Sequence, residues 1–238
     1  MVKDLPNLTK TEYVDSHCHI LPGVDHGAKD QATAFAMAQS LCSMGFSSSI
    51  ATPHYYFYEE SADSFVSRRN ASVSSTRFPD GFRVISGAEI AYEIGLSKRC
   101  DLSKLVIEGT DRVMIELPMK RYSKTTVEEL YDIRSRLGLK SILAHIERYI
   151  PFMTFNDLYE LSLVDDLVFQ MNIYSFNRFI SRHLMRRLLG SGANIVFGTD
   201  IHGTDDRLSH TEKGLKKIKD ILHPQDLCHI MSCEDILL

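Results

Sequence analysis

The sequence predicts an α/β fold in which parallel strands form a barrel. Short β-branched or apolar runs alternate with segments of helical period, which is typical of βα units around a parallel sheet or barrel. The predicted strands recur at intervals of roughly 26 to 36 residues, and this spacing suits a barrel whose active site lies at the carboxyl ends of its strands. No linker or exact repeat divides the chain, so residues 1–238 are predicted to form one domain.

The first half of the chain is predicted to contain four strands. They lie at residues 13–17, 46–52, 82–89 and 112–116. Residues 30–44 are predicted to be helical, because alanine, leucine and methionine recur on one face and Gly45 follows as a stop signal. The segments 59–80 and 96–108 have a less regular helical pattern and are predicted as looser connections.

The second half alternates more clearly and adds three strands, for a total of seven. These strands are predicted at residues 141–145, 168–172 and 194–199. Helices are predicted at residues 126–137, 156–163 and 182–189, with Gly138 and Gly190 as stops after the first and the third. Residues 211–222 and 224–238 are predicted to form covering helices, the second with Pro224 at a permitted amino-terminal position.

Composition excludes several classes of protein. The chain is 44% hydrophobic and 24% charged, in the ordinary globular range, and its net charge of −4 argues against nonspecific nucleic-acid binding. Five cysteines without a regular framework favour a reducing cytoplasm. Residues 1–10 contain no apolar leader and no run approaches about eighteen apolar residues, so neither secretion nor membrane insertion is predicted.

Metal-ligand residue types follow six of the seven predicted strands. In strand order they are His17 and His19, His54, Glu89, Glu116, His145, and Asp200 with His202. Because the carboxyl ends of barrel strands meet at one rim, these side chains are expected to converge on a polynuclear metal site. Each residue alone has an ordinary alternative as a helix cap, a turn residue or a loop residue. His17 and His19 share one strand face, which turns Cys18 away from the metals.

The ligand types indicate which metals suit the site. Imidazoles and carboxylates without cysteine favour Mn, Fe or Zn over a structural four-cysteine zinc, and manganese is the leading choice. Asp25, Glu89, Glu116 and Asp200 would bring four negative charges. If three divalent cations are assumed, the surplus of two positive charges matches a phosphate dianion. Arg148 and Arg207, on predicted βα loops, would grip phosphate oxygens, with surface ion pairs as the alternative.

Three further features have two interpretations. The aromatic run 55–58 suits an aromatic wall against a substrate ring or plain packing at the rim. Arg182, Arg186 and Arg187 suit an acidic partner, although a solvated helix face is the commoner meaning of such a run. His26 is interpreted as a solvated loop histidine, with an added ligand or proton donor as the alternative.

An ordered set of seven motifs resembles the bacterial PHP phosphatases. The motifs are His-Cys-His, Leu-Pro-Gly-Val-Asp, Ala-Thr-Pro-His, Gly-Ala-Glu-Ile, Ile-Glu-Leu-Pro, Leu-Ala-His-Ile-Glu-Arg-Tyr and Asp-Ile-His. More narrowly, the chain is similar to the manganese-dependent protein-tyrosine phosphatases of the CpsB and YwqE type, encoded with capsule and exopolysaccharide genes. The sequence departs from the usual pattern at His26, Ile146, Ile201 and Gly203, and none of these changes removes a matched ligand.

The resemblance implies a distorted (β/α)7 barrel of the PHP type with three metals. His17, His19, Glu89 and Asp200 would hold the first metal; Glu89, Glu116 and His145 the second; Asp25, His54 and His202 the third. Arg148 and Arg207 would correspond to the phosphate-binding arginines. The implied substrate is a phosphotyrosine protein, such as the tail of a bacterial tyrosine kinase that controls capsular or exopolysaccharide synthesis.

The expected reaction is hydrolysis of a phosphotyrosine monoester by metal-activated water, without a covalent intermediate. A cysteine-dependent route is disfavoured, because no cysteine is followed six positions later by arginine. One alternative is a small-molecule phosphatase of the histidinol-phosphate kind, against which the patterns around Glu116 and Arg148 speak. The other is a regulator that binds phosphoproteins without turnover, which the full set of matched ligands makes a weaker interpretation.

Overall fold

The structure, a computed structural model, describes residues 13–237, and all of the strand pairings in this range are parallel. The expectations for residues 1–10 and for residue 238 lie outside the described residues. The strands are β1 (Tyr13–Cys18), β2 (Phe46–Ala51), β3 (His54–Tyr55), β4 (Arg83–Ser86), β5 (Glu89–Ala91), β6 (Arg112–Glu116), β7 (Lys140–Leu143), β8 (Val168–Asn172) and β9 (Asn194–Gly198).

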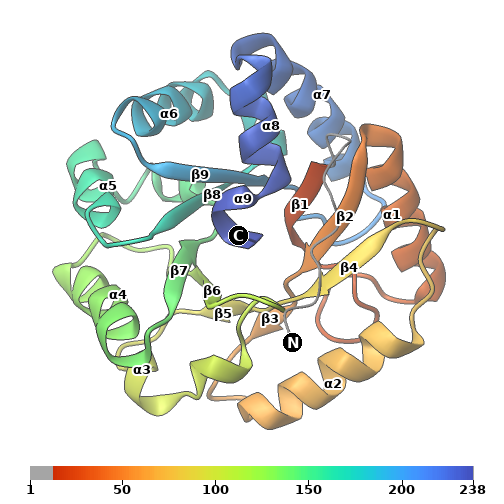
Figure 1. Ribbon diagram of the computed structural model, residues 1–238, viewed down its shortest axis with the longest axis horizontal. Coiled ribbons are helices and arrows are strands. Elements are labelled where there is room, and N and C mark those ends of the chain that lie inside the picture. Colours follow the sequence, from red (N-terminus) through yellow and green to blue (C-terminus); the bar gives the residue numbers. More distant parts are fainter. Residues whose placement is uncertain (1–12, 238) are drawn as a thin grey trace.

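The strands lie in a ring with the helices outside it (Figure 1). They form a three-stranded sheet, β1-β2-β4, and a six-stranded sheet, β3-β5-β6-β7-β8-β9. The sheets meet near β1, where His19 N donates to Ile201 O at 3.0 Å and Asp200 N donates to His17 O at 2.7 Å. These bonds tie the carboxyl end of β1 to the segment that follows β9.

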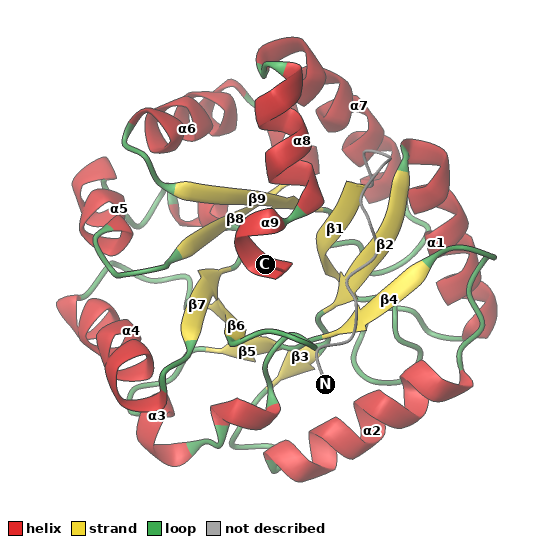
Figure 2. Cartoon of the chain, in the orientation of Figure 1, coloured by secondary structure: helices red, strands yellow, loops and turns green. Residues whose placement is uncertain are grey.

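Most of the helices cover the outside of the ring (Figure 2). The helices are α1 (Gln31–Met44), α2 (Ala62–Ser75), α3 (Leu96–Arg99), α4 (Lys124–Leu137), α5 (Phe155–Ser162), α6 (Phe179–Gly190), α7 (Asp206–Ile221), α8 (Pro224–Ser232) and α9 (Glu234–Leu237), with short 3-10 helices η1 (Leu102–Lys104), η2 (Ile146–Tyr149) and η3 (Ile173–Asn177). No described helix combines the length and apolar character needed to cross a membrane. Asp30 caps α1 by accepting from Thr33 N at 2.8 Å, and Gly45 ends that helix with a φ of 99°.

The predicted strand at 82–89 is two strands, β4 and β5, in different sheets. The division falls at Gly87, whose N–H donates across to Ala51 O at 2.8 Å, so the chain steps from one sheet to the other within three residues. Strand β3 was not expected from the sequence. It pairs with β5 through the register His54 to Glu89, which sets two predicted ligands side by side.

Several helix predictions were wrong in their bounds. The segments 59–80 and 96–108, predicted as looser connections, contain α2 in the first case and only α3 and η1 in the second. The helix predicted to stop at Gly190 includes it, and the left-handed residue that follows is Gly192. Helix α7 begins at Asp206 rather than at 211, because the carboxylate of Asp205 accepts from Arg207 N at 3.0 Å and caps it.

The inside of the ring is filled by an apolar cluster. Its members come from strands around the ring and from the carboxyl-terminal segment: Val14, Ile50, Ile107, Met114, Ile142, Ala144, Val168, Val196, Cys233 and Ile236. Cys233 and Ile236 belong to the turn before α9 and to α9 itself, which lies over the middle of the ring in Figure 2. A second, larger cluster packs the helices onto the strands.

Candidate metal centre

The carboxyl end of β1 brings two imidazoles together. The Nε2 atoms of His17 and His19 lie 3.2 Å apart, and both side chains are buried. The thiol between them faces elsewhere, since Cys18 Sγ lies 3.9 Å from Ile201 O. This arrangement confirms the expected alternation, in which Cys18 turns away from the histidine pair.

Glu89 lies in the middle of the imidazoles. Its Oε2 is 3.1 Å from His17 Nε2, 3.2 Å from His19 Nε2 and 3.2 Å from His54 Nδ1. The same oxygen is buried and has no hydrogen-bond partner among the described residues, so three ring nitrogens surround it without hydrogen-bond geometry. A buried carboxylate oxygen that is left unpaired is costly unless something else, such as a cation, satisfies it.

Glu116 and Asp200 extend the cluster on two sides. Glu116 Oε1 lies 3.3 Å from His145 Nε2, which is also 2.9 Å from Glu89 Oε1. Asp200 Oδ1 lies 3.5 Å from His19 Nε2. The strand ends therefore place acidic oxygens between imidazoles, as the sequence predicts. We call Glu89 and the four histidines His17, His19, His54 and His145 the imidazole centre.

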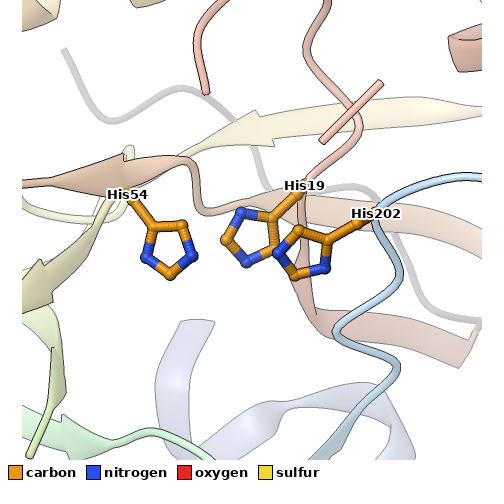
Figure 3. Close-up of side chains that lie close together, drawn as sticks. All are labelled: His19, His54 and His202. Atoms are coloured by element: carbon orange, nitrogen blue, oxygen red, sulfur yellow. The ribbon is translucent and has the colours of Figure 1, made fainter. Parts of the chain in front are cut away.

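His202 completes a three-histidine group with His19 and His54 (Figure 3). The ring of His202 stacks on that of His19, with centroids 3.8 Å apart and an interplanar angle of 16°. Among residues 13–237, ligand atoms within 4.8 Å of one another occur in three groups: His19, His54, His202; His17, His19, Glu89; and His54, Glu89, Glu116. Adjoining groups that share members suit a polynuclear site.

Asp25 lies behind His19. Its Oδ2 accepts from His19 Nδ1 at 2.6 Å and from His54 N at 2.9 Å, while its Oδ1 accepts from Gly27 N at 2.9 Å. This carboxylate therefore orients the His19 ring so that Nε2 faces Glu89. Its expected role as a direct ligand stays a prediction.

Two of the predicted ligands have a left-handed backbone. His145 has a φ of 35° and Asp200 a φ of 52°, each two residues beyond the end of a strand. Such conformations are unfavourable for residues with a Cβ and are found most often at functional sites. The turn at each strand end directs the side chain into the centre instead of along the sheet.

A chain of buried amides supports the centre, and sequence reasoning missed it. Gln170 Oε1 accepts from His145 N at 2.6 Å and from His17 Nδ1 at 3.0 Å, which leaves His17 Nε2 directed at Glu89. Gln170 Nε2 donates to Asn172 Oδ1 at 2.9 Å, and Asn172 Nδ2 donates to Asp200 Oδ2 at 3.0 Å. Two polar residues at alternate positions of the otherwise apolar strand 168–172 were the available signal.

Two arginines border the centre. Arg148 Nη2 pairs with Asp200 Oδ2 and lies 3.2 Å from the hydroxyl of Tyr174. Arg207 Nη1 donates to Asp200 O and lies 3.1 Å from His202 Nδ1. The expected location on loops was wrong for both, because Arg148 belongs to η2 and Arg207 to the first turn of α7. We call Arg148, Tyr174 and Arg207 the arginine rim.

A cavity of about 380 Å³ adjoins the centre, and both arginines of the rim line it. It is lined by His26, His54, Tyr56, Glu116, Arg148, Asp200, His202 and Arg207. His26 is exposed, as interpreted from the sequence, but its ring stacks on those of His54 and His202 with centroids 4.8 Å and 4.7 Å away. Of the aromatic run, Tyr56 faces this cavity, whereas Tyr55 is buried and packs against Phe65.

The electrostatics of the centre favour positive charge. Burial lowers the pKa of His145, but the carboxylates of Glu116 and Glu89 outweigh it and raise that pKa to about 9. Burial likewise opposes the effect of Asp200, Asp25 and Glu89 on His19, whose pKa is raised well above its ordinary value. Burial and the nearby charge of His19 lower the pKa of His202 to about 3, which keeps its ring neutral.

Comparison with known proteins gives a family match and a related phosphatase. A model of the family described as capsular polysaccharide synthesis, CpsB/CapC, matches residues 13–233. The tyrosine-protein phosphatase YwqE of Bacillus subtilis (strain 168) is 32% identical over 144 residues, which cover 57% of this chain and 54% of YwqE. The alignment therefore spans about half the length of that relative.

A solved structure also resembles this chain. It comes from work on YwqE from Bacillus subtilis and CpsB from Streptococcus pneumoniae, described as metal-dependent tyrosine phosphatases. It matches with a TM-score of 0.72 at 22% identity and covers 94% of each chain. At this identity the match shows the shared fold, an α/β fold with parallel sheets.

Proposed function

Since the chain belongs to the CpsB/CapC family of capsular polysaccharide synthesis proteins, we propose that it is a metal-dependent protein-tyrosine phosphatase. One observation carries the proposal. Glu89 Oε2 is buried without a hydrogen-bond partner among the described residues, yet ring nitrogens of three histidines lie within 3.2 Å of it. This arrangement suits a carboxylate that bridges cations, and the bordering arginines suit a phosphate.

The proposed fold is a distorted (β/α)7 barrel of the PHP type, formed by a single domain over residues 1–238. The ring of parallel strands with outer helices supports it, as do the bonds that join β1 to the segment after β9. The split of the third predicted strand into β4 and β5 would be the distortion.

We propose three divalent metals, with Mn preferred and Fe or Zn as alternatives. His17, His19, Glu89 and Asp200 would hold the first metal; Glu89, Glu116 and His145 the second; Asp25, His54 and His202 the third. The donor set fits such ions, because it contains only imidazole nitrogens and carboxylate oxygens. The raised pKa values of His19 and His145 support the fit, because they show that the surrounding carboxylates stabilise positive charge, which a bound cation would supply in place of the protons.

In this mechanism the bound cations would activate a water molecule and neutralise the charge of the transferring phosphoryl group. Arg148 and Arg207 would bind its outer oxygens, having side chains that reach the cavity above the centre. Tyr56, on the opposite wall, would contact the aromatic ring of the substrate. Gln170 and Asp25 would hold His17 and His19 in place throughout.

The proposed substrate is phosphotyrosine on a protein in the cytoplasm, namely the tail of a bacterial tyrosine kinase that regulates capsular or exopolysaccharide synthesis. The family description supports the link to capsular polysaccharide. The similarity to YwqE, which is a tyrosine-protein phosphatase, supports tyrosine phosphatase activity. Neither nucleic acid nor membrane insertion has a part in the proposed function.

Phosphate release from a phosphotyrosine peptide by metal-free protein, before and after Mn is added, tests the proposal. We expect Mn-dependent release that His202→Ala and Arg148→Ala each reduce by about a hundredfold. His229→Ala, which removes an exposed imidazole from α8, serves as the matched control and should keep the rate. Preference for histidinol phosphate would contradict the proposal, as would peptide binding without phosphate release or equal rates in all variants.

A further inference from the structure

A second cavity lies beside the metal-site cavity and shares a wall with it. Its volume is about 630 Å³, which is within the range of ligand pockets. Arg148 lines both cavities, and Tyr174, whose hydroxyl lies 3.2 Å from Arg148 Nη2, lines the second. We call this second space the lateral cavity. A group bound to Arg148 through its phosphate would have the lateral cavity directly beside it.

The far wall of the lateral cavity carries the start of α6. Arg178 and Ile180 line the cavity there, and Ile180 is 47% exposed. No side chain caps the backbone N–H groups at this helix start, and the first turn contains no acidic residue. The amino end of a helix bears partial positive charge, so this wall favours an acidic group.

A row of arginines continues from the cavity along α6. Arg182 and Arg186 lie one helical turn apart on α6, and Arg178 is the residue that immediately precedes the helix. Within residues 13–237 none of the three forms an ion pair with a carboxylate, and α6 itself contains no Asp or Glu. Like charges at this spacing repel one another, so the row costs stability that an acidic partner would restore.

The neighbouring cavity at the start of α7 is less favourable for an acidic ligand. On the other side of Tyr174 a further cavity of about 370 Å³ is lined by Asp205, Asp206, Arg207 and His210. Two carboxylates there would repel an acidic chain. The lateral cavity has one carboxylate in its lining, that of the buried Glu147, beside the two arginines Arg148 and Arg178, so the balance of charge favours a path from the arginine rim through the lateral cavity and over α6.

We propose that the lateral cavity and the arginine row on α6 bind the acidic peptide segment that flanks the phosphotyrosine. The inference rests on the proposed phosphatase function and names the substrate class further: a phosphotyrosine with acidic neighbours. Arg178 and Arg186 attract the flanking carboxylates, while the apolar wall at Ile180 packs against the peptide. Neither arginine touches the metal-site cavity, so they contribute to substrate binding and not to the chemical step.

The test compares three substrates with the Mn-loaded full chain. They are a phosphotyrosine peptide with glutamates on both sides, the same peptide with glutamines, and the free amino acid O-phosphotyrosine. For Arg178→Ala/Arg186→Ala we expect KM for the glutamate peptide to rise about tenfold, as two exposed ion pairs of a few-fold each would give. KM for the other two substrates should change less than about twofold, and kcat should stay constant for all three.

Arg77→Ala is the matched control, because it removes an exposed arginine from the segment between α2 and the amino end of β4. It should leave all three KM values unchanged. Equal losses on all three substrates would overturn the inference in favour of a general charge effect, and equal losses on both peptides would overturn the acidic preference. If the unaltered protein releases phosphate from none of the three substrates, the proposed function itself is wrong, which is a separate result.

Discussion

The imidazole centre and the arginine rim are neighbours, but they are built in different ways. In the centre, His17 and Glu89 have side-chain exposures of 0% and 1%. At the rim, Arg148 and Arg207 are 29% and 31% exposed. The centre is held by strand ends and by buried amide hydrogen bonds, whereas the rim is held by a 3-10 helix and by the first turn of α7.

This difference separates two tasks. Buried ligands with fixed ring orientation suit cation binding, which needs geometry that does not relax. Partly exposed arginines suit an exchangeable anion, because their contacts can pass from Asp200 to an incoming phosphate. Changes in the centre should therefore affect metal content, and changes at the rim should affect turnover while metals stay bound.

The largest effect is expected from Glu89→Ala. This change removes the oxygens that four imidazoles approach, so bound metal should be lost along with activity. Phosphate release should fall by about a thousandfold or more, since metal catalysis supplies several powers of ten in rate. Metal analysis measures the loss of metal and steady-state kinetics measure the loss of activity. Glu128→Gln, at an exposed position of α4, is the control. Full metal content in Glu89→Ala would contradict the proposed bridging role.

Arg207→Ala should affect the rim alone. We expect kcat/KM for a phosphotyrosine peptide to fall by about a hundredfold, because one donor to the transferring phosphoryl group is removed. Metal content should match that of the unaltered protein. Arg136→Ala, an exposed ion-paired arginine on α4, is the comparison variant. Loss of metal from Arg207→Ala would mean that the rim and the centre are not separate.

Gln170→Met tests whether the hydrogen bonds of the Gln170 amide are needed for metal binding at the centre. The change keeps the approximate volume but removes the acceptor for His17 Nδ1 and His145 N. Mn affinity should weaken by about 10-fold to 100-fold, which is usual for residues that orient metal ligands. Titration of the metal-free protein with Mn measures this affinity. Gln225→Met, at an exposed position of α8, is the control. Unchanged affinity would show that the strand ends alone position the imidazoles.

Gly214→Ala should give the smallest change in activity. A Cβ at this position would lie 2.0 Å from Ile173 O, so α7, which carries Arg207, must shift away from η3. We expect the free energy of unfolding to fall by about 1–3 kcal/mol, with a modest rise in KM. Gly190→Ala on α6 has open space around the new methyl group and should be neutral or slightly stabilising. Urea unfolding compares the two, and equal stabilities would contradict the close packing of α7 on η3.

Much of this picture follows from local patterns along the chain. The α/β class with parallel strands is confirmed, and the family resemblance drawn from the ordered motifs is confirmed by the family match. Most strand positions were predictable because apolar runs and glycine stops are local signals, whereas β3 and the division between β4 and β5 were not. The metal assignment, the arginine roles and the substrate stay predictions, although the predicted residues do lie together.

The sequence by itself determined which residues have metal-binding chemistry and that they follow the strands, because residue type and strand period are readable along the chain. Only the tertiary structure decided how they meet. The step at Gly87 sets Glu89 beside His54, and the turns at His145 and Asp200 aim both side chains inward. Gln170 binds His17 across a sequence separation of 153 residues. Such contacts depend on closure of the ring, and no local pattern specifies them.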